Sequence, residues 1–365
     1  MSKIISISTA VPGHKHLQDD LFLFADKVYS RDETDSRKLK FLYRHSGISS
    51  RYSVIPDFTG PKAAYNFFPK NDTLSPVPTI EERMTYFSEH ATALSVEAIE
   101  KCIKGHINSS DITHLITVSC TGLSAPGLDL LVMEAMGLPT NIFRSSINFM
   151  GCYAAVHAMK MANALSLSDP NANIVIVCTE LCTLHFQTEP SVDNLTASLL
   201  FADGSAAFLV QHDSQPAKGL VMDNFYSQVS YGGKKDMAWQ LSSTGFLMTL
   251  TGYVPALIKQ DFGALLGNAL ASAGLQKDEV THWCIHPGGT KILDAIADVI
   301  SLEKDKLKNS YDVLNEYGNM SSPTILFVLK RIMEKLQQDG RDAGHIFGAA
   351  FGPGLTMETF TAHYA

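Results

Sequence analysis

Apolar and polar positions alternate in patterns that change repeatedly between strand and helix periods along the chain. Residues 3–9 (KIISIST) have the two-residue alternation of a strand. The proline-rich residues 56–78 predict a loop. Thr79 with Glu82 then forms a capping box, which begins a helix that runs to about Lys104.

The middle of the chain continues this alternation of strands and helices. Buried strands are predicted in DITHLITVSCTG, which ends at Gly122, and in NANIVIVCTE, with a short helix in GLDLLVMEAMG. The run SSINFMG followed by CYAAVHAMKMANAL predicts a strand, a tight turn and a helix. Residues 198–210 (SLLFADGSAAFLV) predict two strands joined by a hairpin turn at Asp203-Gly204.

The second half of the chain repeats elements of the first half in the same order. KDEVTHWCIHPGG matches SSDITHLITVSCTG, and EYGNMSSPTILFVLKRIMEKL is comparable to MGCYAAVHAMKMANAL. A connector lies at about 212–219 (HDSQPAKG). We therefore expect a duplicated α/β architecture with halves at 1–215 and 216–365, whose loops meet along one seam.

Composition and charge narrow the class of protein. The 365 residues are 45% hydrophobic and 18% charged, which predicts a folded globular chain. A net charge of −8 argues against nucleic acid as a partner. The start MSKIISISTAVPG is too short in its apolar part for a secretory signal, and no apolar run approaches the roughly 18 residues of a membrane span. Six cysteines in apolar runs predict reduced thiols, so we expect a cytoplasmic enzyme.

Cys152 is the candidate nucleophile. It lies where a strand turns into a helix, directly after Gly151, which lets the turn close tightly. Backbone N–H groups and the positive end of the helix dipole at that point would stabilise a thiolate. The alternative is a small buried thiol that only fills space. The other cysteines lie within strands, near a helix end or at a loop start, where a structural role is favoured: Cys102, Cys120, Cys178, Cys182 and Cys284.

His286 and Asn319 are the candidate partners of this cysteine. His286 ends the strand VTHWCIH and is followed by Pro-Gly-Gly, so its side chain can face a crevice. Asn319 precedes a predicted helix in YGNMSSPT. Each has a structural alternative, a core histidine and a helix-capping asparagine. Their weight comes from the set, since all three residues lie at turns distributed over two similar halves.

Two other chemistries compete for the same residues. His282, Cys284 and His286 alternate on one strand and are zinc-ligand types, but this spacing is unusual for zinc and no fourth ligand is apparent. Papain-like proteases also use Cys, His and Asn in this order, with the histidine about 130–150 residues after the cysteine. Their local signature is absent here, because the sequence around Cys152 reads NFMGCY.

Five ordered motifs carry a resemblance to a known family: FMGCYAA, SLLFADGSAA, CIHPGG, YGNMSSPT and FGPGLTMET. Together they resemble the chalcone and stilbene synthase superfamily, in particular the bacterial type III polyketide synthases, over essentially the whole chain. The resemblance implies a thiolase-like, five-layered αβαβα sandwich and a homodimer with one active site per subunit. It also implies acyl-CoA and malonyl-CoA as substrates, with no metal and no redox cofactor.

The resemblance assigns roles to residues within these motifs. Cys152 corresponds to the acyl-carrying nucleophile, and His286 and Asn319 to its two catalytic partners. Phe201 matches the gatekeeping phenylalanine. A further set corresponds to the loop that shapes the cyclisation cavity: Gly352, Pro353 and Gly354.

Several positions depart from the family pattern. Met248 stands where plant members have a second gatekeeping phenylalanine, and Cys120 replaces a cavity threonine. Together with the small Ala125, these residues suggest room for a longer acyl chain. The candidates for binding the phosphates of coenzyme A, with ordinary solvated surface as the alternative, are Lys38, Lys40, Arg44 and Arg51.

The expected reaction is an iterated decarboxylative condensation of malonyl-CoA with a starter carried on Cys152, followed by cyclisation to an alkylpyrone, a resorcinol, a resorcylic acid or a related ring. An initiating ketoacyl-acyl carrier protein synthase, which would release one linear product, is the nearest alternative, and an acyl carrier protein is a second candidate donor of the starter. A hydroxymethylglutaryl-CoA synthase would need a catalytic Glu that is not assignable. A non-catalytic partner subunit is the alternative from another class.

Overall fold

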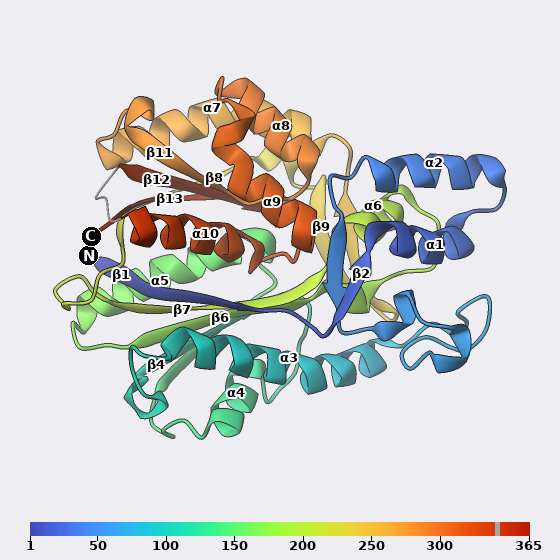
Figure 1. Ribbon diagram of the computed structural model, residues 1–365, viewed down its shortest axis with the longest axis horizontal. Helices are drawn as coiled ribbons and strands as arrows, with labels where there is room; N and C mark the ends of the chain where they lie inside the picture. Colours follow the sequence, from blue (N-terminus) through green and yellow to red (C-terminus); the bar gives the residue numbers. More distant parts are fainter. Residues whose placement is uncertain (340–343) are drawn as a thin grey trace.

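Five layers of secondary structure stack in the computed structural model, which describes residues 1–339 and 344–365. From top to bottom in Figure 1 they are helices, a sheet, helices, a sheet and helices. This arrangement confirms the expected αβαβα sandwich.

The lower sheet in Figure 1 comes from the first part of the chain and has the strand order β5-β4-β6-β7-β1. Its strands are β1 (Ser2–Ala10), β4 (His114–Ser119), β5 (Phe143–Asn148), β6 (Ile174–Leu181) and β7 (Asp203–His212). Strand β4 runs parallel to β5 and β6, whereas β7 is antiparallel to β6 and β1. Every residue of β6 is buried, as expected for a strand covered on both faces.

The upper sheet repeats this order as β11-β12-β13-β8. Its strands are β8 (Leu220–Val229), β11 (Val280–Ile285), β12 (His345–Gly352) and β13 (Thr356–Tyr364). Again the first pair is parallel and the next two are antiparallel, which supports the duplicated architecture. The described residues of this sheet include no counterpart of β5. The two sheets join where β1 pairs with β8, at Lys3↔Val221 and Ile4↔Leu220.

Helices α5 (Ala154–Ser168) and α10 (Thr324–Asp339) form the middle layer and contact strands of both halves. The buried face of α5 is rich in alanine: Ala154, Ala155, Ala158 and Ala162. Such small side chains let the helix backbone lie close to both sheets. The helices begin a few residues after Cys152 and Asn319, so the duplication brings the two segments to the same seam.

The outer layers are α3 (Ile80–Ile103) and α4 (Leu128–Met136) on the lower sheet, and α7 (Val254–Ala273) and α8 (Thr290–Val299) on the upper sheet. The expected capping box is present, since Thr79 and Glu82 bond each other's backbone N–H groups at the start of α3. Helix α9 (Lys308–Tyr317) packs on α10. No helix among the described residues has the length and apolarity needed to cross a bilayer.

A group of shorter elements covers the end of the sandwich at the right of Figure 1. It consists of α1 (Gln18–Tyr29), α2 (Glu33–Arg44), α6 (Val192–Leu200), β2 (His14–Leu17), β3 (Ser50–Ser53), β9 (Met237–Ser242) and β10 (Gly245–Leu250). These elements supply much of the wall of the pockets described below.

The hairpin predicted around Asp203-Gly204 is wrong. Residues before this pair form α6, which begins at a cap where Ser191 accepts from Asn194 N, and β7 begins at Asp203 itself. The Asp203 carboxylate is buried and accepts from the backbone N–H groups of Val54 and Thr183. Its polar side chain therefore anchors the covering elements instead of starting a turn.

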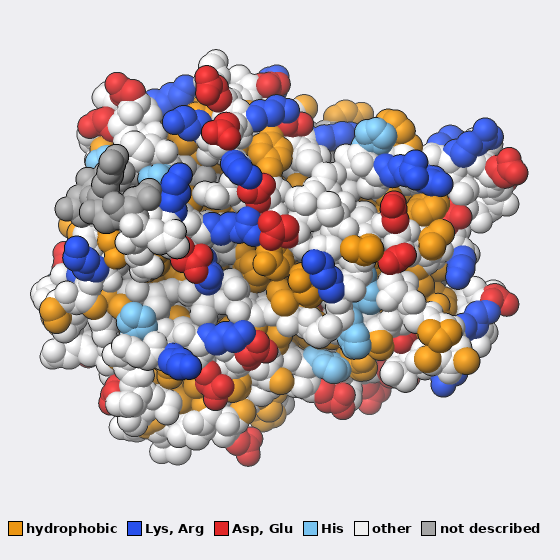
Figure 2. Space-filling view, viewed as in Figure 1, with side chains coloured by type: hydrophobic (Ala, Val, Ile, Leu, Met, Phe, Trp, Pro, Cys, Tyr) orange, Lys and Arg blue, Asp and Glu red, His pale blue; other side chains and the backbone are white. Residues whose placement is uncertain are grey.

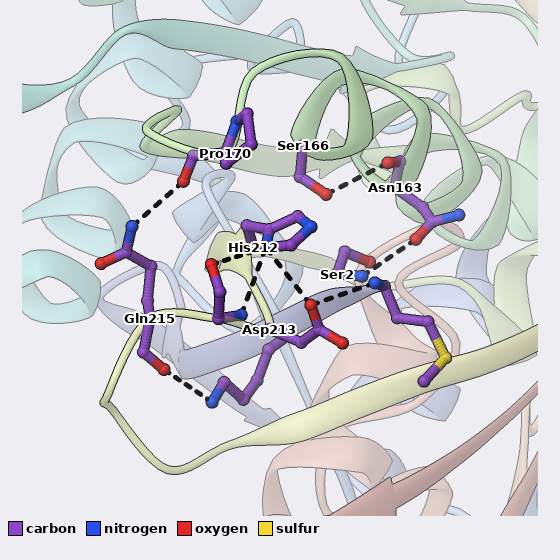
Figure 3. A network of polar contacts seen from close by, with 10 residues as sticks. Ser2, Asn163, Ser166, Pro170, His212, Asp213 and Gln215 are labelled. Atoms are coloured by element: carbon purple, nitrogen blue, oxygen red, sulfur yellow. Dashed lines mark hydrogen bonds and ion pairs between the residues drawn. The ribbon is translucent and has the colours of Figure 1, made fainter.

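The connector between the halves is tied to the start of the chain (Figure 3). Lys3 Nζ donates to the carbonyl of Gln215 at 3.0 Å, and the Gln215 side chain donates to the carbonyl of Pro170 at 3.0 Å. Ser2 N donates to the side chain of Asn163 in α5 at 3.1 Å. These bonds hold β1 in its central place between the two sheets.

Candidate active site

Cys152, His286 and Asn319 line one pocket at the seam between the halves, which we call the catalytic pocket. The pocket encloses about 630 Å³ including its mouth. Cys152 lies in the short turn that leads into α5, His286 directly follows β11, and Asn319 lies between α9 and α10. The structure thus brings together three residues that are far apart in the sequence.

The turn at Cys152 is tight because two residues before it have positive φ angles. Phe149 has φ 58° and Gly151 has φ 73°, the left-handed region in which glycine carries no penalty. A Cβ atom on Gly151 would also lie 2.3 Å from Cδ of Pro353, so a side chain is excluded there. The thiol of Cys152 then lies within reach of Ser321, to whose Oγ it donates at 3.6 Å.

Asn319 is held by its backbone and by its own side-chain oxygen. Its N–H donates to the carbonyl of Leu200, and its carbonyl accepts from Ala202 N, both at 2.9 Å. Its Oδ1 accepts from Ser321 N at 2.8 Å, while Nδ2 makes a long 3.4 Å contact with the carbonyl of Gly288. Because the oxygen is already used, the side chain presents its NH₂ group, a donor, to the pocket.

His286 is almost completely buried, yet neither ring nitrogen has a hydrogen-bond partner among the described residues. Buried polar atoms normally have partners, and unpaired ones often mark functional positions. The imidazole lines the catalytic pocket, where a substrate oxygen can supply the missing partner.

Burial opposes a charge on either group taken alone. It raises the pKa of Cys152 to about 12, although hydrogen bonding with Ser321 and Asn319 acts in the opposite direction. It also lowers the pKa of His286 to about 3. Burial therefore favours a neutral thiol beside a neutral imidazole. The thiolate expected from the helix terminus is not favoured in this state, because the loss of water outweighs the nearby donors. Transfer of the proton from sulfur to imidazole would create both charges together, and their mutual attraction is the interaction that favours it.

A buried polar network behind the nucleophile was not found from the sequence. Glu180 at the end of β6 accepts from Thr121 Oγ1 at 2.7 Å, Ser322 Oγ at 2.8 Å and Cys120 N at 2.9 Å. The Cys120 thiol also donates to this carboxylate at 3.1 Å and lies 3.5 Å from Ser321 Oγ. The sequence feature that could have indicated this network is a glutamate at the end of a buried strand, in IVIVCTE.

A second pocket of about 710 Å³, including its mouth, adjoins the catalytic pocket. We call it the side pocket. The two share four lining residues: Cys182, Phe201, Trp239 and Met248. The remaining lining of the side pocket is mixed: its apolar side chains are Leu21, Phe24, Ala25, Phe58, Phe186, Ala197 and Phe246, and polar side chains such as Arg51, Gln187 and Asn194 also line it. The two positions expected to be gatekeepers, Phe201 and Met248, therefore lie at the boundary between the pockets.

Trp239 and His185 also shape this boundary, and sequence reasoning missed both. Trp239 Nε1 donates to the carbonyl of Cys120 at 2.7 Å. His185 stacks on Phe246, with ring centroids 4.2 Å apart, and its nitrogens pair with the backbone of Thr121 and Phe246. Burial lowers the pKa of His185 to about 3, so the ring stays neutral. No local sequence pattern distinguishes these two residues.

Other cavity candidates fall in different places. Cys120 and Pro353 line the catalytic pocket, with Gly352 and Gly354 on either side of the proline. Ala125 does not: it lies on the exposed loop between β4 and α4 and is absent from the lining of both pockets. The expectation that Ala125 widens the cavity is thus wrong for a single chain. Its loop leads away from the sheet to begin α4.

Three of the four candidate cations for coenzyme A lie on one exposed helix. Lys38, Lys40 and Arg44 are exposed on α2, where Figure 2 shows Lys and Arg side chains at the upper right. Arg51, the fourth candidate for binding coenzyme A phosphates, is not on this surface, since it is only 4% exposed. Its guanidinium donates to Gln18 Oε1 at 3.0 Å and to the carbonyl of Phe201 at 2.5 Å. It is a buried structural residue that a phosphate would have to displace.

His282, Cys284 and His286, which alternate in the sequence, do not form a metal-binding group. The Cys284 thiol is buried between the layers and donates to the carbonyl of Ile325 at 3.6 Å. The His286 ring faces the catalytic pocket. Alternation along the strand therefore does not place the three side chains around one metal site.

Comparison with known families gives matches over both halves of the chain. The family model described as "Chalcone and stilbene synthases, N-terminal domain" matches residues 1–214. The corresponding C-terminal domain matches residues 225–364.

Individual relatives are more distant. The "Alpha-pyrone synthesis polyketide synthase-like Pks18" of Mycobacterium tuberculosis is 28% identical over 97% of this chain and 89% of its own length. The "Probable polyketide synthase 1" of Dictyostelium discoideum is 28% identical over 98% of this chain, which spans 11% of that much longer protein. The crystal structure of PKS-I from the brown alga Ectocarpus siliculosus superposes with a TM-score of 0.93, at 27% identity, over 100% of this chain and 98% of that one.

Proposed function

Because this chain belongs to the chalcone and stilbene synthase family of type III polyketide synthases, we propose that Cys152 carries the growing acyl chain and that His286 and Asn319 drive the condensation. The observation that carries the proposal is the convergence of a thiol, an unpaired imidazole and an oriented amide on one pocket. Members of this family are condensing acyltransferases that use acyl-CoA and malonyl-CoA.

Loading begins with transfer of the Cys152 proton to the imidazole of His286. The thiolate attacks the carbonyl carbon of the acyl-CoA starter and forms a thioester. Coenzyme A leaves as its thiolate and takes the proton back from the imidazolium. Both side chains end neutral, which is the state that burial favours.

Extension then uses the two donors. Malonyl-CoA loses carbon dioxide, and the electron pair of the broken bond becomes the enolate of acetyl-CoA. A ring N–H of His286 and the NH₂ of Asn319 hydrogen-bond the enolate oxygen; each such donor is worth about 2.7–4 kcal/mol on removal. The enolate carbon attacks the thioester and releases the Cys152 sulfur. The extended chain, now on coenzyme A, returns to the cysteine for the next round.

The side pocket supports an aliphatic starter. Most of the surface that lines it is apolar, with phenylalanine, leucine and alanine side chains among the polar ones, and the catalytic pocket adjoins it at Phe201 and Met248. Met248 can change rotamer more easily than the phenylalanine of plant members, so a flexible tail can pass it. We assign the alkyl tail to the side pocket and ring closure to the catalytic pocket. The alpha-pyrone named for Pks18 fits an alkylpyrone as product.

Delivery of the thioester is assigned to the surface of α2. Lys38, Lys40 and Arg44 project into solvent there and provide the positive charge that coenzyme A phosphates need on a protein of net charge −8. An acyl carrier protein is the alternative donor.

All six cysteines, which lie in the described residues, are free thiols, as expected for a cytoplasmic enzyme.

A homodimer is the proposed assembly. One side of the edge strand β5 has no partner strand among the described residues, and Phe143 at its start is 72% exposed. Leu123, on the loop before α4, is 51% exposed. Exposed apolar side chains beside a free strand edge are typical of an interface. Light scattering on the purified protein measures the assembly, and a monomer at all concentrations would refute it.

The test of the function is product analysis with labelled malonyl-CoA and a series of acyl-CoA starters. Cyclic pyrones or resorcinols support the iterative reaction, whereas a single linear β-keto product favours the initiating ketoacyl synthase. No turnover with any thioester favours the non-catalytic subunit. Cys152→Ala should abolish the mass gain of acyl loading, and Cys102→Ala, at a buried thiol outside both pocket linings, is the matched control.

A further inference from the structure

Three side chains with metal-binding atoms meet on the upper sheet, away from both pockets: Asp223, His345 and His363. They lie on the adjacent strands β8, β12 and β13. His345 and His363 are direct partners across the β12–β13 pair. The pairing of β13 with β8 shifts between Thr361↔Asn224 and Ala362↔Met222, which leaves Asp223 as the extra residue of a bulge.

The bulge explains why an aspartate faces the two histidines. An extra residue in one strand bends that strand and changes the direction of its side chain. Asp223 Oδ1 lies 2.8 Å from His363 Nδ1, and its Oδ2 lies 3.7 Å from His345 Nδ1. One ligand atom from each of the three residues lies within 4.8 Å of the others.

The His345 nitrogen is the observation that a simple ion pair leaves unexplained. His345 Nδ1 is buried and has no hydrogen-bond partner among the described residues. Its distance of 3.7 Å from Asp223 is too long for a hydrogen bond. His363, in contrast, is satisfied by Asp223. A cation placed between the three groups would use the orphaned lone pair.

The spacing suits a small divalent cation. Zinc–nitrogen and zinc–oxygen bonds of about 2.0–2.2 Å in a tetrahedron place ligand atoms about 3.4 Å apart. The separations of 2.8 and 3.7 Å lie on either side of this value. Side-chain exposures of 20% for Asp223, 32% for His345 and 37% for His363 leave access for the ion and for a water molecule as fourth ligand.

We propose that Asp223, His345 and His363 bind a divalent transition-metal ion, zinc by preference, which clamps β8, β12 and β13 together. Imidazole and carboxylate are ligand types that zinc accepts. The clamp acts on the strands that carry the loop of residues 352–354, whose Pro353 lines the catalytic pocket. An ion that binds the folded chain and not the unfolded chain stabilises the fold increasingly as the free ion concentration exceeds its Kd.

The test is thermal unfolding of tag-free, chelator-treated protein titrated with Zn²⁺, together with Co²⁺ absorption as a direct readout of ligation. We expect the melting temperature to rise with the concentration of free Zn²⁺, and bound Co²⁺ to give visible d–d bands that saturate at one equivalent. The rise should weaken as the pH falls, because protonated histidines cannot bind the ion.

Variants identify the ligands. His345→Gln keeps the Asp223–His363 bond intact and should weaken binding by more than about tenfold, since even the loss of a hydrogen-bond partner behind a ligand costs about 10–100-fold. His363→Gln is the second variant, should the first fold poorly. His106→Gln, at an exposed histidine elsewhere, should bind like the unmodified chain. Cys152→Ala should also retain binding, which separates this site from the active-site thiol.

Two results would overturn the proposal. One is a melting temperature that does not respond to Zn²⁺ up to a large excess, which would leave Asp223 and the histidines as an ordinary ion pair. The other is an equal response in the unmodified chain and in both glutamine variants, which would place the ion elsewhere.

Discussion

Filling the side pocket should change which starters the enzyme accepts. Ala197 on α6 lines that pocket and is half-buried, so the larger side chain of Ala197→Phe can enter the empty space without displacing the core. The substitution leaves Cys152, His286 and Asn319 untouched. Its effect therefore reports on the tail of the starter and not on the chemistry.

The magnitude follows from the apolar area that the tail buries. Burial of one methylene group is worth about 0.8 kcal/mol, which corresponds to about a fourfold change in kcat/KM for each added carbon. In the unmodified chain, kcat/KM should rise by about this factor until the tail fills the side pocket. If the phenyl ring of Ala197→Phe replaces four methylenes, long starters should lose about 3 kcal/mol, or about 200-fold.

The assay measures kcat/KM for saturated acyl-CoA starters from acetyl to palmitoyl. Short starters end in the catalytic pocket and should react as before, while the profile of the variant should level off at a shorter chain. Val192→Phe is the matched control, since Val192 begins the same helix but is 74% exposed and lines neither pocket. An unchanged length profile in Ala197→Phe would refute the assignment of the tail to the side pocket.

Three further predictions concern stability and binding. Arg51→Ala should lower the free energy of unfolding by about 3 kcal/mol, because it leaves buried hydrogen-bond partners unpaired. Lys38→Ala should leave the free energy of unfolding unchanged and raise KM for acyl-CoA. Denaturant titration and initial rates measure these effects, and an equal loss of stability in both variants would contradict the argument from burial. Because the pKa of His286 is lowered to about 3, the unfolded chain binds a proton between pH 6.5 and about 3 that the folded chain does not bind, so stability falls as the pH falls through that window. His286→Gln should reduce the slope of unfolding free energy against pH there by up to about 1.4 kcal/mol per pH unit. The same slope in the variant and the unmodified chain would argue against a neutral buried ring. Gly151→Ala should lower both stability and kcat, because its Cβ would meet a proline ring 2.3 Å away; Gly105→Ala, also at positive φ but with no atom within 4 Å, should show only the backbone penalty of about 1–2 kcal/mol, and equal losses would rule out the clash.

The main lines of the fold could be read from local pattern. The capping box at Thr79 and the apolar run of β6 gave elements close to those observed, because caps and burial on both faces leave periodic signals in short windows. The failure at Asp203-Gly204 has a physical cause. The same dipeptide serves a hairpin turn or the start of a strand, and the choice depends on whether partners such as Val54 N and Thr183 N come to the carboxylate.

The candidate site divides in the same way. Cys152 after a glycine, His286 at a strand end and Asn319 before a helix are marked by neighbours in the sequence, and the fold brings these three into one pocket. The position of Arg51 was not marked. Its polar neighbours in the sequence, two serines, suggest an exposed side chain, but the guanidinium is buried and donates to Gln18.

The sequence by itself determined the alternation of strands and helices, the repeat of the two halves and the identity of the residues at the turns, because each of these is written in a few consecutive positions. Only the tertiary structure decided that Ala125 lies outside both pockets, that Trp239 and His185 enter the wall between them, and that Asp223 meets His345 and His363. These facts depend on strand register, a bulge and packing between segments far apart in the chain, and such contacts are set by the free energy of the whole fold, not by any short stretch of it.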